Sequence, residues 1–194
     1  MKKIPTLFKR EFDSRGRLVA VFDEITPGCE EAFYYGKATI KIDGSCCAII
    51  DGEFYKRYGA KKGKKPPEGA IPCCEPDPIT GHHPHWVKVN REDPADKWFV
   101  EAYNNCKFEL TDGTYEAIGK HFNGNPYAVT RDWLVRHGNQ DICIDRDFES
   151  IKKFLSEYEI EGLVFWLNDE PVCKIKRTDF GLKWPLEYDD EARV

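Results

Sequence analysis

The sequence has no long apolar run and no basic excess, and each absence excludes a class of protein. No stretch approaches the roughly 20 consecutive apolar residues that a membrane-spanning helix needs. The first residues, MKKIPTLFKR, carry positive charge, but no apolar segment follows as it would in a signal peptide. A formal net charge of −5 excludes a general electrostatic attraction to nucleic acid. We therefore expect an intracellular protein without membrane contact, whose contact with any nucleic acid is local.

The chain also lacks a repeat of solenoid length and a long Ser/Gly linker. Its 194 residues fit one globular unit, so we expect a single domain over residues 1–194. Eight cysteines would suggest disulfides in a small secreted protein, but without an export signal we expect reduced thiols, in the cytoplasm or nucleus. One basic stretch, KRYGAKKGKK from Lys56 to Lys65, is either a local contact surface or a solvated loop.

Alternating residues and turn signals predict a chain built mainly of short strands. One helix is expected in DFESIKKFLSEY, where apolar residues recur at helical spacing and Asp147 caps the start. Residues 65–94, rich in proline, glycine and histidine, are expected to form a long irregular loop. Three hairpins are expected: residues 6–12 with 17–22, residues 38–50 with 53–58 around the turn Asp51-Gly52, and residues 162–166 with 171–176. Two further strands are expected at residues 96–103 and 107–119.

The main candidate for a chemically active segment is Lys41-Ile42-Asp43-Gly44. Strand alternation places Ile40 and Ile42 on one face, toward the core, and Lys41 and Asp43 on the other. Such a short pattern recurs by chance and carries little weight alone. Three further segments follow in order on predicted strands and give it weight: Glu116-Ala117-Ile118-Gly119, Glu161-Gly162-Leu163-Val164 and Lys174-Ile175-Lys176.

This series resembles motifs I, III, IV and V of the covalent nucleotidyltransferases, which include DNA ligases, RNA ligases and mRNA-capping guanylyltransferases. KIDGSCC, GHHPHW, EGLVFW and CKIKRTDFGLKWP are most similar to the small 5'-phosphate/3'-hydroxyl RNA ligases of animals and large viruses. The resemblance implies an α+β adenylation domain, with antiparallel sheets around a nucleotide cleft and helices outside. Only about 18 residues follow Lys176, too few for the OB-fold that DNA ligases and capping enzymes carry, so none is expected.

The resemblance also implies the reaction: ATP-dependent joining of RNA 5'-phosphate and 3'-hydroxyl ends through a lysyl-AMP on Lys41 and an RNA-adenylate. A lysine attacks phosphorus only when unprotonated, and the charges of Lys174 and Lys176 would favour that form while stabilising the α-phosphate. Mg²⁺, or Mn²⁺, would assist. The implied catalytic residues are Lys41, Lys174 and Lys176, the implied nucleotide-binding residues are Ile40, Asp43, Gly44, Arg57, Glu116, Glu161, Lys174 and Lys176, and the implied metal ligands are Glu116 and Glu161.

Several alternatives stay open at this point. The protein could be a GTP-dependent capping guanylyltransferase, or a relative that binds nucleotide or RNA ends without catalysis. The sequence does not divide the roles of Glu116 and Glu161, and Glu101 is a secondary candidate for the nucleotide pocket. In related enzymes motif VI helps to orient pyrophosphate, and Lys9 and Arg10 could take that role here. We expect a monomer. Two sets of residues remain undecided: the aromatic that stacks on adenine (Phe122, Tyr127 or Trp133) and a less favoured zinc site (Cys73, Cys74, His82, His83 and His85).

Overall fold

The fold is that of a computed structural model, which describes residues 3–60, 63–78 and 80–186. Contacts along the chain divide it into two compact units. Among the described residues, the central unit is Asp43–His137, and the terminal unit comprises Ile4–Ile42 and residues 138–186. Both consist mainly of antiparallel strands with few helices, which confirms the α+β class. The expectation of a single domain stays a prediction.

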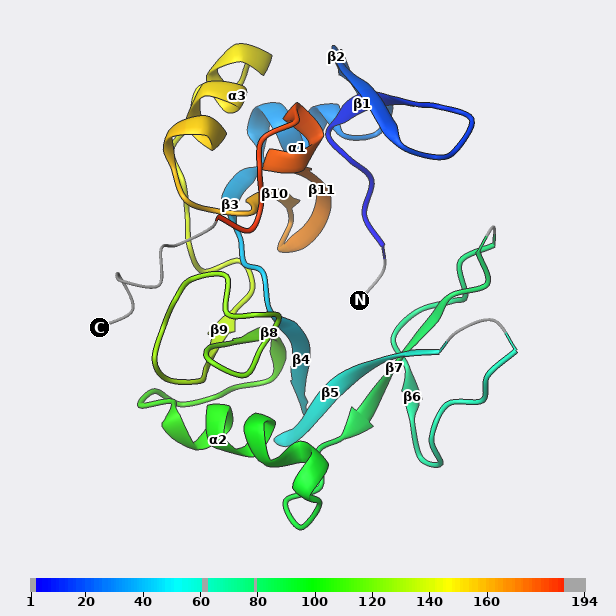
Figure 1. Ribbon diagram of the computed structural model, residues 1–194, viewed down its shortest axis with the longest axis vertical. Coiled ribbons are helices and arrows are strands. Elements are labelled where there is room, and N and C mark those ends of the chain that lie inside the picture. The colour runs from blue at the N-terminus through cyan, green and yellow to red at the C-terminus, as the bar shows by residue number, and fades with distance from the viewer. Residues whose placement is uncertain (1–2, 61–62, 79, 187–194) are drawn as a thin grey trace. The chain divides into compact units, whose positions relative to one another are not determined.

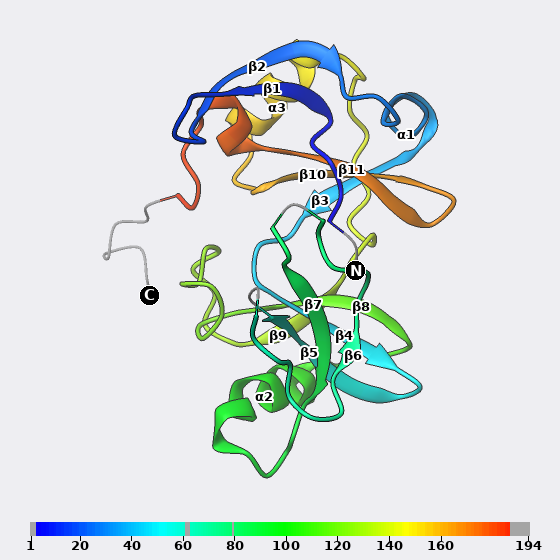
Figure 2. The same cartoon turned by 90° about the vertical axis from the view of Figure 1, so that its right-hand side faces the viewer.

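The terminal unit contains a three-stranded antiparallel sheet in the order β11-β10-β3 (Figure 1). Its strands are β3 (Lys37–Lys41), β10 (Gly162–Leu167) and β11 (Glu170–Lys176). β10 and β11 turn at Asn168 and Asp169, both with positive φ, so the predicted hairpin is confirmed. A second predicted hairpin is also confirmed, because β1 (Phe8–Phe12) pairs with β2 (Leu18–Ile25) as a separate antiparallel ribbon (Figure 2).

Helices α1 (Glu30–Tyr35) and α3 (Phe148–Glu157) complete the core of the terminal unit. α3 is the predicted helix, and the Asp147 carboxylate caps it by accepting a hydrogen bond from the Ser150 amide at 2.8 Å. The sequence analysis missed α1 and the short 3-10 helix Arg177–Phe180. The core brings both helices, the hairpin and the sheet together through residues that include Phe8, Phe33, Ile151, Leu155, Leu163, Phe165 and Ile175.

The central unit holds a six-stranded antiparallel sheet in the order β6-β7-β5-β4-β8-β9. The predicted hairpin at Asp51-Gly52 is confirmed, because both residues have positive φ and join β4 to β5. The strands are β4 (Ser45–Ile50), β5 (Glu53–Ala60), β6 (Ile71–Pro72), β7 (His83–Lys88), β8 (Gly113–Ile118) and β9 (Trp133–Arg136).

The strand predicted at residues 96–103 is wrong: Lys97–Asn105 forms α2, which follows a 3-10 turn at Pro94–Asp96. Its bulky residues suit a strand by intrinsic propensity, but helical spacing places Trp98, Ala102 and Cys106 on one side, and these pack on the core of the central unit. Burial of that face decided between the two structures.

Three other expectations need correction. The predicted strand 38–50 is broken at residues 42–44, so β3 and β4 belong to different sheets and different units. The loop expected at 65–94 contains β6 and β7, and only 113–118 of the segment 107–119 is a strand. Ile40 and Ile42 are only half-buried, whereas Ala38 on their strand face is buried in the core.

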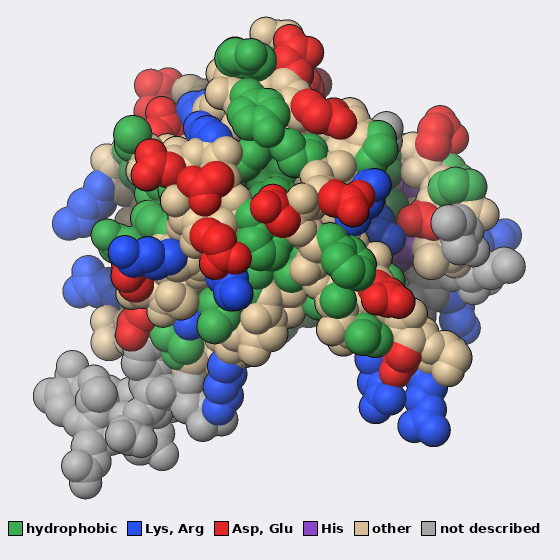
Figure 3. All heavy atoms as spheres, turned by 90° about the horizontal axis from the view of Figure 1, so that it is seen from above, with side chains coloured by type: hydrophobic (Ala, Val, Ile, Leu, Met, Phe, Trp, Pro, Cys, Tyr) green, Lys and Arg blue, Asp and Glu red, His purple; other side chains and the backbone are tan. Residues whose placement is uncertain are grey.

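Charges of both signs are interspersed with hydrophobic side chains on the face shown in Figure 3. This agrees with the small negative net charge of the sequence. Residues 61 and 62 of the basic stretch Lys56–Lys65 lie outside the described residues. Within the described part of the chain, no helix combines the length and apolar character that crossing a membrane requires.

Candidate functional site

The sheet of the terminal unit places two of the three candidate lysines on the two strands that flank β10. Gly162 of β10 pairs with Lys41 of β3 on one side and with Lys176 of β11 on the other. Directly paired residues of antiparallel strands project to the same face of a sheet. Lys174 is two residues from Lys176 in β11 and therefore shares that face, while Ile175 is fully buried opposite, as predicted.

The lysine predicted as nucleophile forms an ion pair with one of the predicted carboxylates. Lys41 Nζ donates to Glu161 Oε2 at 2.5 Å, and the side chains are only 23% and 11% exposed. Glu161 immediately precedes β10, so pairing of β10 with β3 brings the carboxylate to the lysine at the strand end. The Glu161 carbonyl also accepts from the Arg177 amide, which fixes this corner of the backbone.

Lys174 lies in a partly desolvated, positively charged environment. Burial lowers its pKa, and the charges of Lys41 and Lys176 lower it further, while Glu161 and Asp179 act in the opposite direction. The backbone around it is fixed from the other side, because the Lys174 amide donates to the Pro5 carbonyl at 3.1 Å. The two neighbouring lysines therefore disfavour the charged form of Lys174.

Gly162 allows β11 to lie close to β10. A Cβ atom built at this position would lie 2.1 Å from the Ile175 carbonyl oxygen and 2.9 Å from the Lys176 Cα. No side chain fits there without moving β11, so glycine is needed where the strands carrying Lys41 and Lys176 flank β10. The sequence analysis placed Gly162 in a motif but assigned it no role.

In the central unit, Asp43 and Gly44 lie in the segment before β4. The Asp43 amide donates to Tyr127 Oη at 2.7 Å, and the Asp43 carboxylate accepts from Asn123 Nδ2 at 2.5 Å. A Cβ on Gly44 would lie 2.3 Å from the Ala117 carbonyl oxygen. The close backbone approach expected at Gly44 therefore exists, and the backbone that approaches it belongs to β8.

Glu116 lies in β8 beside two residues that the sequence analysis did not connect with it. His137 Nε2 lies 2.8 Å from Glu116 Oε2, and His137 Nδ1 lies 2.9 Å from Thr114 Oγ1. Cys46 is the direct partner of Glu116 on β4, and burial, followed by the Glu116 charge, raises the pKa of its thiol to about 12. The charge of Arg57, an exposed residue of β5, acts on that pKa in the opposite direction.

Several secondary candidates have other partners or positions. Glu101 is exposed on α2. Lys9 pairs with Glu24 at 2.6 Å and Arg10 pairs with Asp179 at 3.0 Å, both within the terminal unit. In the part of the chain that the structure describes, the side chains grouped closely enough to ligate one metal ion are Cys46, Glu116 and His137, and the cysteine and histidine segment 73–85 gives no such group.

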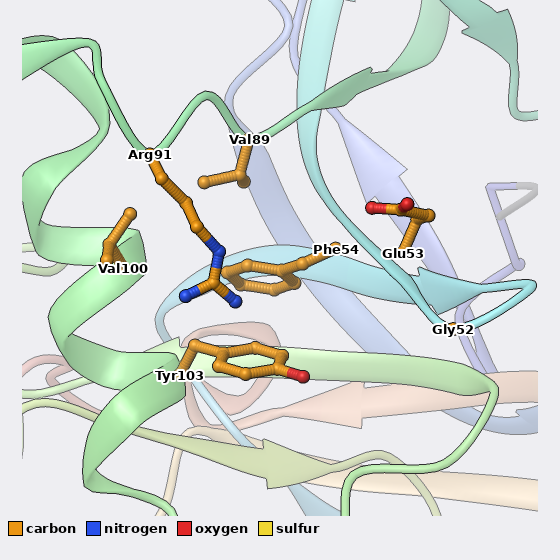
Figure 4. A pocket seen from close by; sticks show the side chains of 7 residues that line it. All are labelled: Gly52, Glu53, Phe54, Val89, Arg91, Val100 and Tyr103. Carbon is orange, nitrogen blue, oxygen red and sulfur yellow. The ribbon is translucent and has the colours of Figure 1, made fainter.

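The aromatic candidates differ in their surroundings. Phe122 is buried in the core of the central unit, whereas Tyr127 and Trp133 are half-buried. A small pocket elsewhere in the central unit includes none of the predicted site residues (Figure 4). There the Arg91 guanidinium lies 5.1 Å from the centre of the Tyr103 ring.

The contacts of Tyr127, Asn123 and His137 could not be found from sequence. Tyr127 was considered only as a stacking ring, and its hydroxyl instead meets a backbone amide 84 positions away. His137 is a single histidine after a strand that was not predicted. Neither contact has a characteristic spacing, because both depend on how β8, β9 and the segments beside them pack.

The pattern of lysines and carboxylates on these antiparallel strands agrees with the similarity of this chain to known proteins. The sequence profile of the family RNA ligase 1 matches residues 95–191, half of the chain. RNA ligase 1 of Rattus norvegicus is 26% identical over 227 aligned positions, covering 79% of this chain and 70% of that protein. RNA ligase 1 of Mus musculus is also 26% identical, with coverages of 79% and 69%. The chain belongs to the RNA ligase 1 family, which confirms the resemblance to the animal RNA ligases.

Proposed function

We propose that this protein is an ATP-dependent RNA ligase that joins RNA 5'-phosphate and 3'-hydroxyl ends through a lysyl-AMP on Lys41. The observation that carries the proposal is the alignment of Lys41 and Lys176 on either side of Gly162, with Glu161 bound to the Lys41 amine. Membership of the RNA ligase 1 family supports the substrate class. An adenylation domain of the nucleotidyltransferase type is part of the same proposal.

In the first step, Lys41 Nζ attacks the α-phosphorus of ATP, a P–N bond forms, and pyrophosphate leaves. The amine must be neutral to attack, but the Glu161 carboxylate stabilises its charged form. We infer that this ion pair positions Lys41 before ATP binds. Attack then requires the Glu161 carboxylate to turn to another partner, which frees the Lys41 amine.

Lys174 and Lys176 place two positive charges on the sheet face that carries Lys41. These charges would stabilise negative charge developing on the α-phosphate during attack. We therefore assign both lysines catalytic roles.

The Glu161 and Glu116 carboxylates suit a hard divalent cation, since Mg²⁺ and Mn²⁺ prefer oxygen ligands. Each is held in place within its own unit, Glu161 by Lys41 and Glu116 by His137. A bound Mg²⁺ would supply charge neutralisation on the phosphates. The nucleotide-binding roles of Ile40, Asp43, Gly44 and Arg57 remain proposals, and Asp43 already has defined partners in Asn123 and Tyr127.

The later steps transfer AMP from Lys41 to the RNA 5'-phosphate and then release AMP when the 3'-hydroxyl attacks that phosphate. A capping guanylyltransferase would use the same lysine chemistry with GTP. Family membership supports ligation, and no observation favours capping or a protein without catalysis. The nucleotide specificity is therefore tested directly.

The deciding experiment is intact-mass spectrometry of the full chain after incubation with ATP and Mg²⁺, and separately with GTP. We expect a gain of one AMP with ATP, no gain with GTP, and no gain for Lys41→Ala. The Lys176→Ala variant should keep its circular dichroism spectrum but form the adduct at least about tenfold more slowly, since one lost charge-assisted contact is worth about 1.5–3 kcal/mol.

Lys153→Ala is the matched control, because it removes a lysine whose amine pairs with Glu157 on α3 of the same unit. Its adduct should form at the wild-type rate. An AMP adduct on Lys41→Ala would refute the assignment of the nucleophile, and a GMP adduct would favour capping. The adduct-bearing protein should then seal RNA with 5'-phosphate and 3'-hydroxyl ends without further ATP.

A further inference from the structure

We propose that Cys46, Glu116 and His137 of the central unit form a binding site for a transition-metal ion of the Zn²⁺ type, distinct from the Mg²⁺ of the ligation reaction. One sulfur, one imidazole nitrogen and one carboxylate oxygen all lie within 4.8 Å of one another. Zn²⁺ favours this donor set, whereas Mg²⁺ does not bind thiolate well. The three donors leave a fourth tetrahedral position for water or another ligand.

The strands bring these donors together. Cys46 and Glu116 are direct partners on β4 and β8, so their side chains project to the same face. Glu116 pairs in turn with Val135 of β9, two residues before His137. Donors fixed on a paired sheet lose little conformational freedom when a metal binds, which favours binding.

The distance between the His137 and Glu116 donors requires only a small adjustment. With bonds of about 2.0–2.3 Å, ligand atoms around tetrahedral zinc lie roughly 3.3–3.8 Å apart. His137 Nε2 and Glu116 Oε2 are now 2.8 Å apart, joined by a hydrogen bond. An ion between them would replace that hydrogen bond and separate the two atoms by about half an ångström.

The orientation of His137 is the strongest argument. Its Nδ1 lies 2.9 Å from Thr114 Oγ1, and its main-chain amide donates to the Thr114 carbonyl at 3.1 Å. Histidines that bind metals usually donate their second ring N–H to a protein oxygen, which fixes the tautomer and directs the other nitrogen to the ion. Once an ion replaces the hydrogen bond between Nε2 and Glu116, Thr114 Oγ1 can accept from Nδ1–H and leave the Nε2 lone pair for the metal.

Two charges set the properties of the site. Glu116 is 11% exposed and offers its negative charge to a cation. The exposed Arg57 of β5 adds a positive charge that opposes the cation.

Zn²⁺ bound at this site would also affect the proposed ligation reaction. This effect rests on the proposed function, whereas the metal site does not. Zn²⁺ would occupy the Glu116 carboxylate, which we assign to nucleotide or Mg²⁺ binding. Micromolar Zn²⁺ should then slow adduct formation on Lys41 and should slow it less in Cys46→Ser. The metal site itself is tested by metal binding and not by activity. It can therefore be confirmed or refuted even if no adduct forms on Lys41.

Cobalt is the probe for the test, because tetrahedral Co²⁺ bound to thiolate gives a sulfur-to-metal charge-transfer band. We would titrate Co²⁺ into the full metal-free chain of wild type, Cys46→Ser and Cys143→Ser, which removes an exposed cysteine of the terminal unit. We expect a band saturating at one equivalent in wild type and Cys143→Ser, displaced by Zn²⁺ and lost in Cys46→Ser. Thr114→Val should weaken binding by about tenfold.

No saturating band in wild type, or an unchanged band in Cys46→Ser, would overturn the proposal, and His137 would then serve only to orient Glu116. A second measurement avoids substitution in case Cys46→Ser fails to fold. One equivalent of Zn²⁺ should slow alkylation of Cys46 at least tenfold in wild type, read by peptide mass spectrometry. Equal alkylation of Cys46 with and without Zn²⁺ would also refute the site.

Discussion

Replacing Gly162 by alanine should move β11 and so disrupt the alignment of Lys41 and Lys176 on one face of the sheet. The added Cβ would lie 2.1 Å from the Ile175 carbonyl oxygen, whereas ordinary contact begins at 3.4 Å, so the strands must separate locally by up to 1.3 Å. Overpacking of this kind costs about 1–3 kcal/mol. For a chain of this size, each kcal/mol lowers Tm by about 2–4 °C.

Function should suffer more than stability in Gly162→Ala. Lys41 and Lys176 flank Gly162 in register, and misplacement of catalytic groups by about 1 Å can cost 100-fold in rate. Thermal unfolding and the rate of lysyl-AMP formation would be measured together. The matched control is Gly59→Ala in β5, where the new Cβ meets only the exposed ring of His82, at 2.9 Å. Wild-type stability and adduct rate in Gly162→Ala would refute this reasoning.

Two further substitutions test the charges and the helix cap. Lys174→Met should abolish efficient adduct formation yet raise stability at pH 7 by about 1 kcal/mol, because a charged lysine is no longer buried beside two others. Since folding lowers the pKa of Lys174, wild type should regain stability relative to this variant as the pH rises toward 10.5, which denaturation at several pH values would show. Asp147→Ala should lower Tm at pH 7, because hydrogen bonds from the Ser150 amide and side chain lower the pKa of the capping carboxylate. That stability is present above the usual value of 3.8 and is lost as the pH falls through the folded pKa, so equal Tm values at pH 7 would contradict the assigned cap.

Prediction from sequence succeeded where all the residues that specify a turn or a helix lie within one short segment. The hairpin at Asp51-Gly52 and the capped helix α3 follow from turn chemistry and spacing within about a dozen residues. The same rules failed for α2, whose aromatic residues favour a strand until the face that they bury is known. They also failed at residues 42–44, where a single apolar stretch divides between two sheets.

The sequence by itself determined the family, the order of the lysine and glutamate motifs, and the alternation that places Lys174 and Lys176 on one strand face. Those properties depend on the identity and spacing of neighbouring residues. Only the tertiary structure decided that Glu161 pairs with Lys41, that Gly162 lies between Lys41 and Lys176, and that His137 reaches Glu116. These contacts join residues separated by 14 to 121 positions, and strand register, which no local pattern specifies, sets each of them.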